Sequence, residues 1–451
     1  MIKSLLGVAL CLGTSTLEAS VEHNKMIKKE PLIHYKKIEL KNGLKIIVIP
    51  NGALPVVTVG MIVHVGTADD PADQVGLSHF LEHMMFSGTR KIPEDQFNKI
   101  ILKNGGHNNA FTEYDMTFYY TTIHKAHMGK ILQMEADRLR NLAFTKKKVD
   151  SEKKVVLEER GMRVENHPFG SMFERYLQVT NPYHPYGIPP IGYPHHIQKY
   201  NYNSTRQHYD AWYQPNNTTL VIVGGTTMEE VKPLVEKYFN SLKKKGTFTT
   251  PQRIANPNRD GVTHVIRQKN PRNAMQILSW SYDAPNYTSV KNIKEYYALC
   301  LLDQMLAGHS LTPLYVDLVD ESEQLLNISS HYDGDGLDPR SFSITATINP
   351  KYQLDDIKDK ILEKIKTHIK NLDEDNLKLS KKVLLNSLSK MFDGNESLAS
   401  NIALMLGHQQ SIDDLNHFEK KIEQVTLEDV KAAAEKYLKD HHSVLEIMPA
   451  S

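Results

Sequence analysis

The sequence predicts an α+β fold made of two homologous units, and three observations support this expectation. With 451 residues the chain is too long for one ordinary hydrophobic core, which favours two domains or more. Short stretches rich in β-branched residues alternate with longer segments of helical periodicity. The pattern found before residue 241 returns after residue 261, which indicates two copies of one unit.

The amino-acid composition is that of an ordinary globular protein. Charged residues make up 24% of the chain, hydrophobic residues make up 40%, and the formal net charge is +1. This balance offers no basic field for nucleic acid and does not indicate disorder. Beyond the N-terminus no segment has the ~18 consecutive apolar residues of a membrane span, so we expect a soluble mature chain.

The N-terminus has the pattern of a secretory signal peptide. Lys3 supplies a positive charge, residues 5–13 form a short apolar run, and the small residues Ala19 and Ser20 follow. We therefore expect residues 1–20 to be removed and the mature chain to be secreted across the inner membrane into the periplasm. The alternative is a buried N-terminal helix, because the run is too short to span a bilayer.

The chain has only two cysteines, Cys11 and Cys300. Removal of the signal peptide would take Cys11 with it and leave Cys300 without an intramolecular partner. We therefore expect no disulfide within the mature monomer, even though its compartment permits one.

The elements of the first unit follow from local patterns. A hairpin is predicted around the Asn42-Gly43 turn, because Asn-Gly between alternating apolar residues favours a tight two-residue connection. A long strand of β-branched residues follows at 55–67. The remaining predictions are a helix that begins at Pro93 and ends at Gly105-Gly106, a hairpin over 108–123, and helices within 124–144 and 146–167.

Residues 246–261 are predicted to link the two units. They belong to a stretch punctuated by lysine and proline that shows neither helical nor strand periodicity. A hairpin and strand pattern then returns at 263–286. The predicted domains are therefore 21–245 and 262–451.

An offset of 220 residues, set by Gly88 and Gly308, aligns the two units. It pairs Leu299 with His79, Leu302 with Glu82, and Asp303 with His83. The polar trio is therefore present only in the first unit.

The stretch "GLSHFLEHMMFSGT" carries that trio and predicts a metal site. On a helix His79 and His83 lie one turn apart on one face, and Glu82 lies on the same face. Zinc favours two neutral imidazoles and a carboxylate, with a fourth position left for a water that becomes a good nucleophile. Glu82 lies next to one ligand and could act as general base toward that water. The order His-x-x-Glu-His is the inverzincin signature.

A plain buried helix is the competing interpretation, but three ionisable groups on an apolar face are costly to bury without a partner such as a metal. A third ligand is required. In "DSEKKVVLEERGM" Glu152 and Glu159 lie seven residues apart on roughly one helix face. Helix geometry alone does not choose between Glu159 and its neighbour Glu158.

The sequence resembles the pitrilysin, insulysin and mitochondrial processing peptidase family of zinc metallopeptidases. In that family a metal-binding glutamate follows His-x-x-Glu-His at a spacing that the 75 residues between His83 and Glu159 match. The resemblance implies that His79, His83 and Glu159 bind Zn²⁺ and that Glu82 is the catalytic base. Glu152 matches a further family glutamate, which does not bind the metal itself but holds one of the metal ligands in place.

The resemblance covers the whole mature chain and implies more of the fold. The expected fold is pitrilysin-like, with an antiparallel sheet and packed helices in each unit, and the two units form a clamshell around an extended peptide. "GGHNNAFTEYDMTFYY" looks like the family's edge-strand motif, in which the strand around Asn109 and Ala110 pairs with the substrate backbone. "HPYGIPPIGY" and "WYQPNN" are also similar to family segments.

One departure from the family bears on partners. Many two-domain members supply an arginine and a tyrosine from the second unit, but Val319 and Leu326 stand at the matching positions. Neither could stabilise a tetrahedral intermediate. We therefore expect a homologous partner subunit that lacks the zinc trio, or else a homodimer or monomer that works without the pair.

The expected function is hydrolysis of extended peptides or unfolded segments by a zinc endopeptidase. One alternative is a non-catalytic subunit of a protease complex that keeps zinc for stability, although such a site needs no base. Another is a different zinc hydrolase, such as an amidase. Other polar residues are not expected to take part in the site. We expect His107 to be a surface residue, His195 and His196 to be solvated, and the lysine runs at 146–148 and 243–245 to form solvated faces.

Overall fold

A computed structural model describes residues 32–52, 54–167, 169–244, 253–254, 264–270, 275–439 and 443–449. The predicted signal peptide and all of the predicted linker except Arg253 and Ile254 lie outside the described residues. Residues 33–451 form one compact unit. Within the described part of the chain, no helix is long and apolar enough to cross a membrane.

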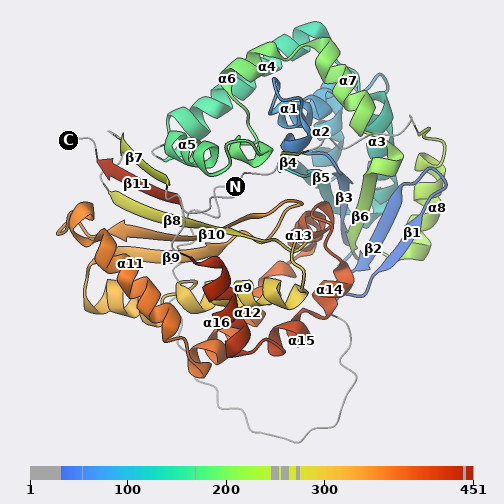
Figure 1. Ribbon diagram of the computed structural model, residues 1–451. Helices are drawn as coiled ribbons and strands as arrows, with labels where there is room; N and C mark the ends of the chain where they lie inside the picture. The colour runs from blue at the N-terminus through green and yellow to red at the C-terminus, as the bar shows by residue number, and fades with distance from the viewer. Residues whose placement is uncertain are drawn as a thin grey trace, which may run out of the picture. The chain divides into compact units, whose positions relative to one another are not determined.

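The first half is built on a six-stranded sheet of order β1-β2-β6-β3-β5-β4 (Figure 1). Its strands are β1 (Lys36–Glu39), β2 (Lys45–Pro50), β3 (Val56–Val63), β4 (His107–Thr112), β5 (Thr117–His124) and β6 (Thr218–Gly224). Neighbouring strands are antiparallel except β2 and β6, which are parallel. Both hairpins predicted in the first half are present, and β4 lies at an edge. The hairpin pattern predicted at 263–286 was wrong for the two strands described there, 264–270 and 276–284, because a third strand from the C-terminal end, 443–449, lies between them.

Helices of the first half pack on the sheet and form its main core. They are α1 (Leu77–Met84), α2 (Glu94–Lys103), α3 (Met128–Asn141), α4 (Lys146–Arg160), α5 (Gly170–Thr180), α6 (Pro194–Lys199), α7 (Tyr202–Trp212) and α8 (Met228–Phe239). The side chains of α1 that carry this packing are Leu77, Phe80, Leu81 and Met84, all at most 1% exposed. Burial of such side chains stabilises the fold by roughly 1.5–3 kcal/mol each.

The second half repeats this architecture in a five-stranded sheet of order β7-β11-β8-β10-β9. Its strands are β7 (His264–Asn270), β8 (Gln276–Ala284), β9 (Leu325–Tyr332), β10 (Arg340–Ile348) and β11 (Ser443–Pro449). Here β7 and β11 are the parallel pair, in the place of β2 and β6. The order and direction of strands are therefore those of the first sheet without β1, which confirms the predicted duplication. Each sheet is antiparallel, as expected, except for this one parallel pair.

The helices of the second half follow its strands in the same way. They are α9 (Ile293–Leu306), α10 (Pro313–Tyr315), α11 (Leu354–Lys370), α12 (Glu374–Met391), α13 (Asn395–Gly407), α14 (Ile412–Asn416), α15 (Phe418–Glu423) and α16 (Leu427–Tyr437). The helix α9 is the counterpart of α1 at the predicted offset. It carries a core of its own, which includes Leu299 and Leu302.

Helices of each half pack on the sheet of the other half. In α13, Leu398, Ala399 and Ile402 pack against first-sheet residues such as Ile62 and Val223. In α5, Met172 packs against Leu445 and Ile447 of β11. The two halves therefore share hydrophobic core, and the first sheet is covered by helices on both faces (Figure 1).

The linker residue Arg253 ties both halves together electrostatically. Its guanidinium contacts Asp69 at 2.9 Å, Asp115 at 2.5 Å and Asp338 at 2.8 Å. Asp69 and Asp115 belong to the first half and Asp338 to the second. Burial lowers the pKa of Arg253, but the carboxylates outweigh this effect and raise it, so the group stays charged.

Candidate metal centre and active site

The helix α1 is held at its N-terminus by Asp70. Gly76 precedes α1 in a left-handed conformation, with φ of 99°, which glycine adopts without strain. The Asp70 carboxylate accepts the backbone N–H groups of Gly76 at 2.7 Å and Ser78 at 3.0 Å and also the Ser78 hydroxyl. These bonds satisfy first-turn donors that a helix leaves free, and they fix the direction in which α1 presents its histidines.

His79, His83 and Glu159 converge on one point. Their ligand atoms all lie within 4.8 Å of one another, and no other such group of three occurs among the described residues. Glu159 Oε2 lies 3.7 Å from His79 Nε2 and 3.2 Å from His83 Nε2. Two ligand atoms at zinc distance and tetrahedral angle would lie about 3.3 Å apart. Glu159 Oε2 is also buried without a hydrogen-bond donor, so the residues fit a zinc ion.

The same arrangement decides between the two candidate glutamates. Glu159 joins the histidines, whereas Glu158 is exposed on another face of α4. The helix register that sequence alone could not choose is thus resolved by how α4 packs on α1.

Protonation states differ between the two histidines. Burial lowers the pKa of His79 to about 3, so its imidazole is neutral at neutral pH and has a lone pair for a metal. For His83, burial lowers the pKa, but the neighbouring carboxylates, chiefly those of Glu152 and Glu159, outweigh this effect and raise it to about 9. A metal at this point would compete with a proton for the His83 imidazole.

Glu82 projects from α1 beside the cluster. Its carboxylate accepts a hydrogen bond of 2.5 Å from the Thr112 hydroxyl. Burial raises the pKa of Glu82 to about 7, against the opposing effect of the Thr112 hydrogen bond. A nearby divalent cation would lower it again. A carboxylate with a pKa in this range is well placed to accept and return a proton.

A second layer of side chains orients the ligands. Glu152 Oε1 lies 3.1 Å from His83 Nδ1, so it holds the imidazole with Nε2 toward Glu159. Lys148 contacts Glu152 at 2.8 Å, and Arg163 contacts the other oxygen of Glu159 at 2.7 Å. Of these residues, only Glu152 was predicted from the sequence. Thr112, Lys148 and Arg163 were missed, and Lys148 was expected on a solvated face. Their spacing of four residues from Glu152 and Glu159 on one helix was the available signal for the two cations.

The predicted substrate residues lie on the free edge of the first sheet. Asn109 and Ala110 belong to β4, which pairs with β5 on one side only. The Ala110 N–H donates to the side-chain oxygen of its neighbour Asn109 at 2.9 Å. This bond blunts the open edge, a common protection against unwanted strand pairing. Thr112, the last residue of β4, joins this strand to Glu82.

The second half has no equivalent of this site in its described residues. Leu299 and Leu302 are fully buried in its core. Val319 packs against the same core, and Leu326 is 46% exposed on the edge strand β9. Neither side chain has a polar group.

The histidines that were not expected to bind metal lie outside the metal cluster. His107 is exposed and pairs with Glu396 of α13 at 2.6 Å. His195 is exposed, as expected, but His196 is buried rather than solvated, and its ring meets that of Tyr193 edge-on. Neither belongs to a group of metal-ligating side chains.

Sequence comparison matches both halves to one family. The profile described as "Insulinase (Peptidase family M16)" matches residues 46–188, which include the whole metal cluster. The profile described as "Peptidase M16 inactive domain" matches residues 199–384. The chain belongs to peptidase family M16. An M16 chain with both domain types is expected to have two α+β halves of one topology, and the two sheets confirm this.

Relatives of this M16 chain include proteases of similar length. The zinc protease PqqE of Helicobacter pylori is 27% identical over 452 aligned residues, which cover 98% of this chain and 97% of that protein. A crystal structure of a protease from Helicobacter pylori has a TM-score of 0.84 at 25% identity and covers 93% of this chain and 100% of that one. The periplasmic protease PqqL from Escherichia coli has a TM-score of 0.77 at 18% identity, and 48% of its chain is covered.

The predicted membership of the pitrilysin, insulysin and processing peptidase family and the predicted fold class are thereby confirmed. The relatives' zinc protease names agree with the expected kind of enzyme and metal. The roles of individual site residues, the domain boundaries, the location and the partner stay predictions.

Proposed function

We propose that this protein is a zinc endopeptidase that hydrolyses extended peptides or unfolded protein segments. The observation that carries the proposal is the convergence of His79, His83 and Glu159 next to the carboxylate of Glu82. Zinc held by these three side chains would acidify a water molecule and polarise the scissile carbonyl. The names of relatives such as the zinc protease PqqE support the same activity.

The chain's own residues account for the remaining tasks. Glu82 takes a proton from the attacking water and returns it to the leaving amine. Thr112 holds the Glu82 carboxylate on the side of β4. Backbone groups around Asn109 and Ala110 align the peptide by strand addition, after Asn109 releases the Ala110 N–H. Glu152 holds the His83 imidazole in the tautomer with Nε2 free for the metal.

The test combines metal analysis with peptide cleavage. Zinc-loaded wild type, together with the partner proposed below, is expected to cleave an internally quenched peptide, and Glu82→Gln in the same preparation is expected to keep zinc and lose cleavage. Cleavage by zinc-loaded Glu82→Gln would overturn the role of the base. Zinc bound as tightly by Glu159→Ala as by wild type would overturn the ligand assignment.

The competing function is a zinc-containing, non-catalytic subunit of a protease complex. A profile described as an inactive domain matches the second half. An intact Glu82 beside an incomplete ligand set favours catalysis, since structural zinc sites usually have four protein ligands. Wild type that binds zinc but cleaves no peptide, alone or with its partner, would favour the competing function.

The proposed partner is a homologous subunit, or a second copy of this chain, that faces the zinc site. The apolar Val319 and Leu326 leave this chain without the arginine and tyrosine that the family resemblance leads us to expect. This chain covers 48% of the protease PqqL, which is therefore about twice as long. One PqqL chain could hold the counterparts of both this chain and its proposed partner. Co-purification from the native host tests this proposal, and an active preparation that contains only this chain as a monomer would overturn it.

We further propose a periplasmic location and domain limits at 21–245 and 262–451, with residues 1–20 removed and 246–261 as linker. The periplasmic description of PqqL supports the location. The first element described after the proposed linker is β7, which begins at His264. N-terminal sequencing of the mature protein from an osmotic-shock fraction tests the location and the cleavage site together.

A further inference from the structure

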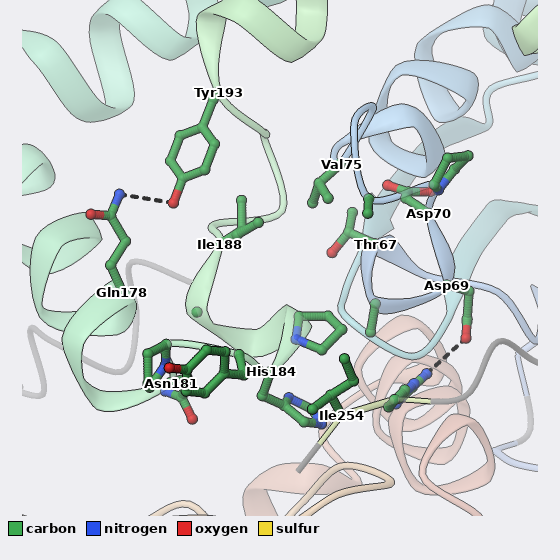
Figure 2. A pocket seen from close by; sticks show the side chains of 18 of the residues that line it. Thr67, Asp69, Asp70, Val75, Gln178, Asn181, His184, Ile188, Tyr193 and Ile254 are labelled. Carbon is green, nitrogen blue, oxygen red and sulfur yellow. Dashed lines mark hydrogen bonds and ion pairs between the residues drawn. The ribbon is translucent and has the colours of Figure 1, made fainter. Parts of the chain in front are cut away.

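A large cavity lies beyond the N-terminus of α1, the helix that carries the proposed zinc ligands His79 and His83. It has a volume of about 830 Å³, within the range of roughly 300–1,000 Å³ that small-molecule and peptide-sized ligands occupy. Figure 2 shows Tyr193 and Gln178 on one side of it and Thr67 and Val75 on the opposite side. None of the predicted site residues lines it.

The walls of this cavity combine apolar and polar groups. Val75, Ile188, Tyr193 and Trp212 supply aliphatic and aromatic surface. The hydroxyl of Thr67 is buried, with the side chain 1% exposed, and has no hydrogen-bond partner among the described groups. Figure 2 shows this side chain directed at the open space. Buried polar groups are nearly always satisfied, so the hydroxyl calls for a hydrogen-bonding occupant.

Two residues that line the cavity are bonded to the segment that directly follows the edge strand β4. The backbone N–H groups of Thr67 and Ala68 donate to the carbonyls of Glu113 and Tyr114 at 3.1 and 2.8 Å. Those two residues directly follow Thr112, whose hydroxyl reaches Glu82. An extended chain advances about 3.3 Å per residue, so a peptide paired with β4 reaches the cavity two or three residues beyond the point opposite Thr112.

We propose that this cavity binds two or three residues of the peptide substrate at one side of the scissile bond, at least one of them aromatic or large and aliphatic. This proposal rests on the endopeptidase function proposed above. A peptide brings both the apolar side chains that match Tyr193 and Trp212 and the backbone groups that match Thr67. The cavity therefore makes cleavage depend on the residues at that distance from the bond.

Two exposed alanines allow the cavity to be filled without disturbing the buried network. Ala72 and Ala211 both line it and both are exposed. Ala72→Phe and Ala211→Phe place a ring in the space that the substrate side chain would take. Ala432→Phe, at an exposed position of α16, is the matched control. Thermal unfolding of all three variants checks that each folds as wild type does.

Binding is measured in a Glu82→Gln background, with blocked serine-rich peptides in which a Phe-Leu pair is moved one residue at a time. The protein has two tryptophans, Trp212 in the cavity and Trp280 in the second sheet. Trp280→Phe leaves Trp212 as the reporter, and fluorescence anisotropy of the labelled peptide gives the dissociation constant in both tryptophan backgrounds.

We expect one position of the pair to bind at least about tenfold more tightly and to change Trp212 emission, because burial of such side chains is favourable by that much or more. Both filling variants should remove this gain, and Ala432→Phe should keep it. Affinity independent of the position of the pair, or equal in filled and control variants, would overturn the proposal.

Cleavage by the enzyme without the Glu82 change separates the two proposals. Peptides cleaved with the same side-chain preference by wild type and Ala211→Phe would overturn the cavity proposal and leave the endopeptidase in place. No cleavage by zinc-loaded wild type, alone or with its partner, with Trp212 still reporting position-dependent binding, would overturn the endopeptidase and leave a peptide-binding cavity.

Discussion

Thr112 donates a hydrogen bond of 2.5 Å to the Glu82 carboxylate, and so joins the edge strand β4 to α1, the helix that carries the proposed zinc ligands His79 and His83. The two residues are 30 positions apart in the chain. A peptide that pairs with β4 therefore binds to the strand that also holds the proposed base. Substrate alignment and base orientation share one element.

This bond predicts a defect in turnover rather than in binding. Thr112→Val should lower kcat by about 10–100-fold with little change in KM, because a misplaced catalytic group costs rate on that scale. Thr112→Ser should restore most of kcat. Steady-state kinetics with a quenched peptide, at equal zinc content, gives the comparison.

Thr121→Val is the matched control for Thr112→Val. Thr121 lies on the neighbouring strand β5, and its buried hydroxyl has no partner in the described structure. The control should keep wild-type kcat. A similar loss in both variants would mean that the effect comes from the sheet and not from the bond to Glu82.

Removal of the support behind His83 should weaken zinc binding. Glu152→Gln loses the charge that holds His83 Nδ1, and changes of this kind typically cost about 10–100-fold in metal affinity. Competition with a chelator of known affinity measures the loss. Glu158→Gln, on the exposed face of α4, should bind zinc as wild type does. Equal affinity of the Glu152 variant and wild type would remove Glu152 from the site.

Loss of the Arg253 guanidinium should destabilise the whole described unit. Arg253→Gln leaves Asp69 and Asp115 buried without their cation, and breaking a buried pair in this way costs about 3–5 kcal/mol of unfolding free energy. Urea unfolding measures it. Lys351→Gln, which breaks an exposed pair with Glu323, should cost less than about 1 kcal/mol. Addition of Asp115→Asn to Arg253→Gln should recover part of the loss, and no recovery would contradict the electrostatic explanation.

The pH dependence of stability should include a contribution from His64. Burial, with a smaller effect of Lys45, lowers the pKa of His64 in the folded state to about 4 from an ordinary value of 6.5. The unfolded state therefore binds the proton first, and the stabilisation is complete above pH 6.5 and is lost as the pH falls toward 4. His64→Gln should show a shallower fall of unfolding free energy over this range. An unchanged slope would show that His64 is free to protonate in the folded protein.

Much of the fold was predictable because it follows from local pattern. The Asn42-Gly43 turn, the β-branched strand β3 and the helix that ends before Gly105 all have short-range causes. The parallel pairing of β2 with β6 and the packing of α13 on the first sheet were not predictable, because they join segments far apart in sequence. In the site, Thr112 and Arg163 were missed for different reasons, since the first contact is long-range and the second depends on the orientation of α4.

The sequence by itself determined the chemistry that this protein can carry: the His-x-x-Glu-His spacing, the glutamate 75 residues later and the absence of that set from the second copy. Side-chain identity and helical periodicity suffice for those inferences. Only the tertiary structure decided that Glu159 rather than Glu158 meets the histidines, that β4 holds Glu82, and that a cavity opens beyond α1. These features depend on how helices and strands pack against one another. Packing decides which of two neighbouring helix residues faces the site, and no local sequence pattern encodes it.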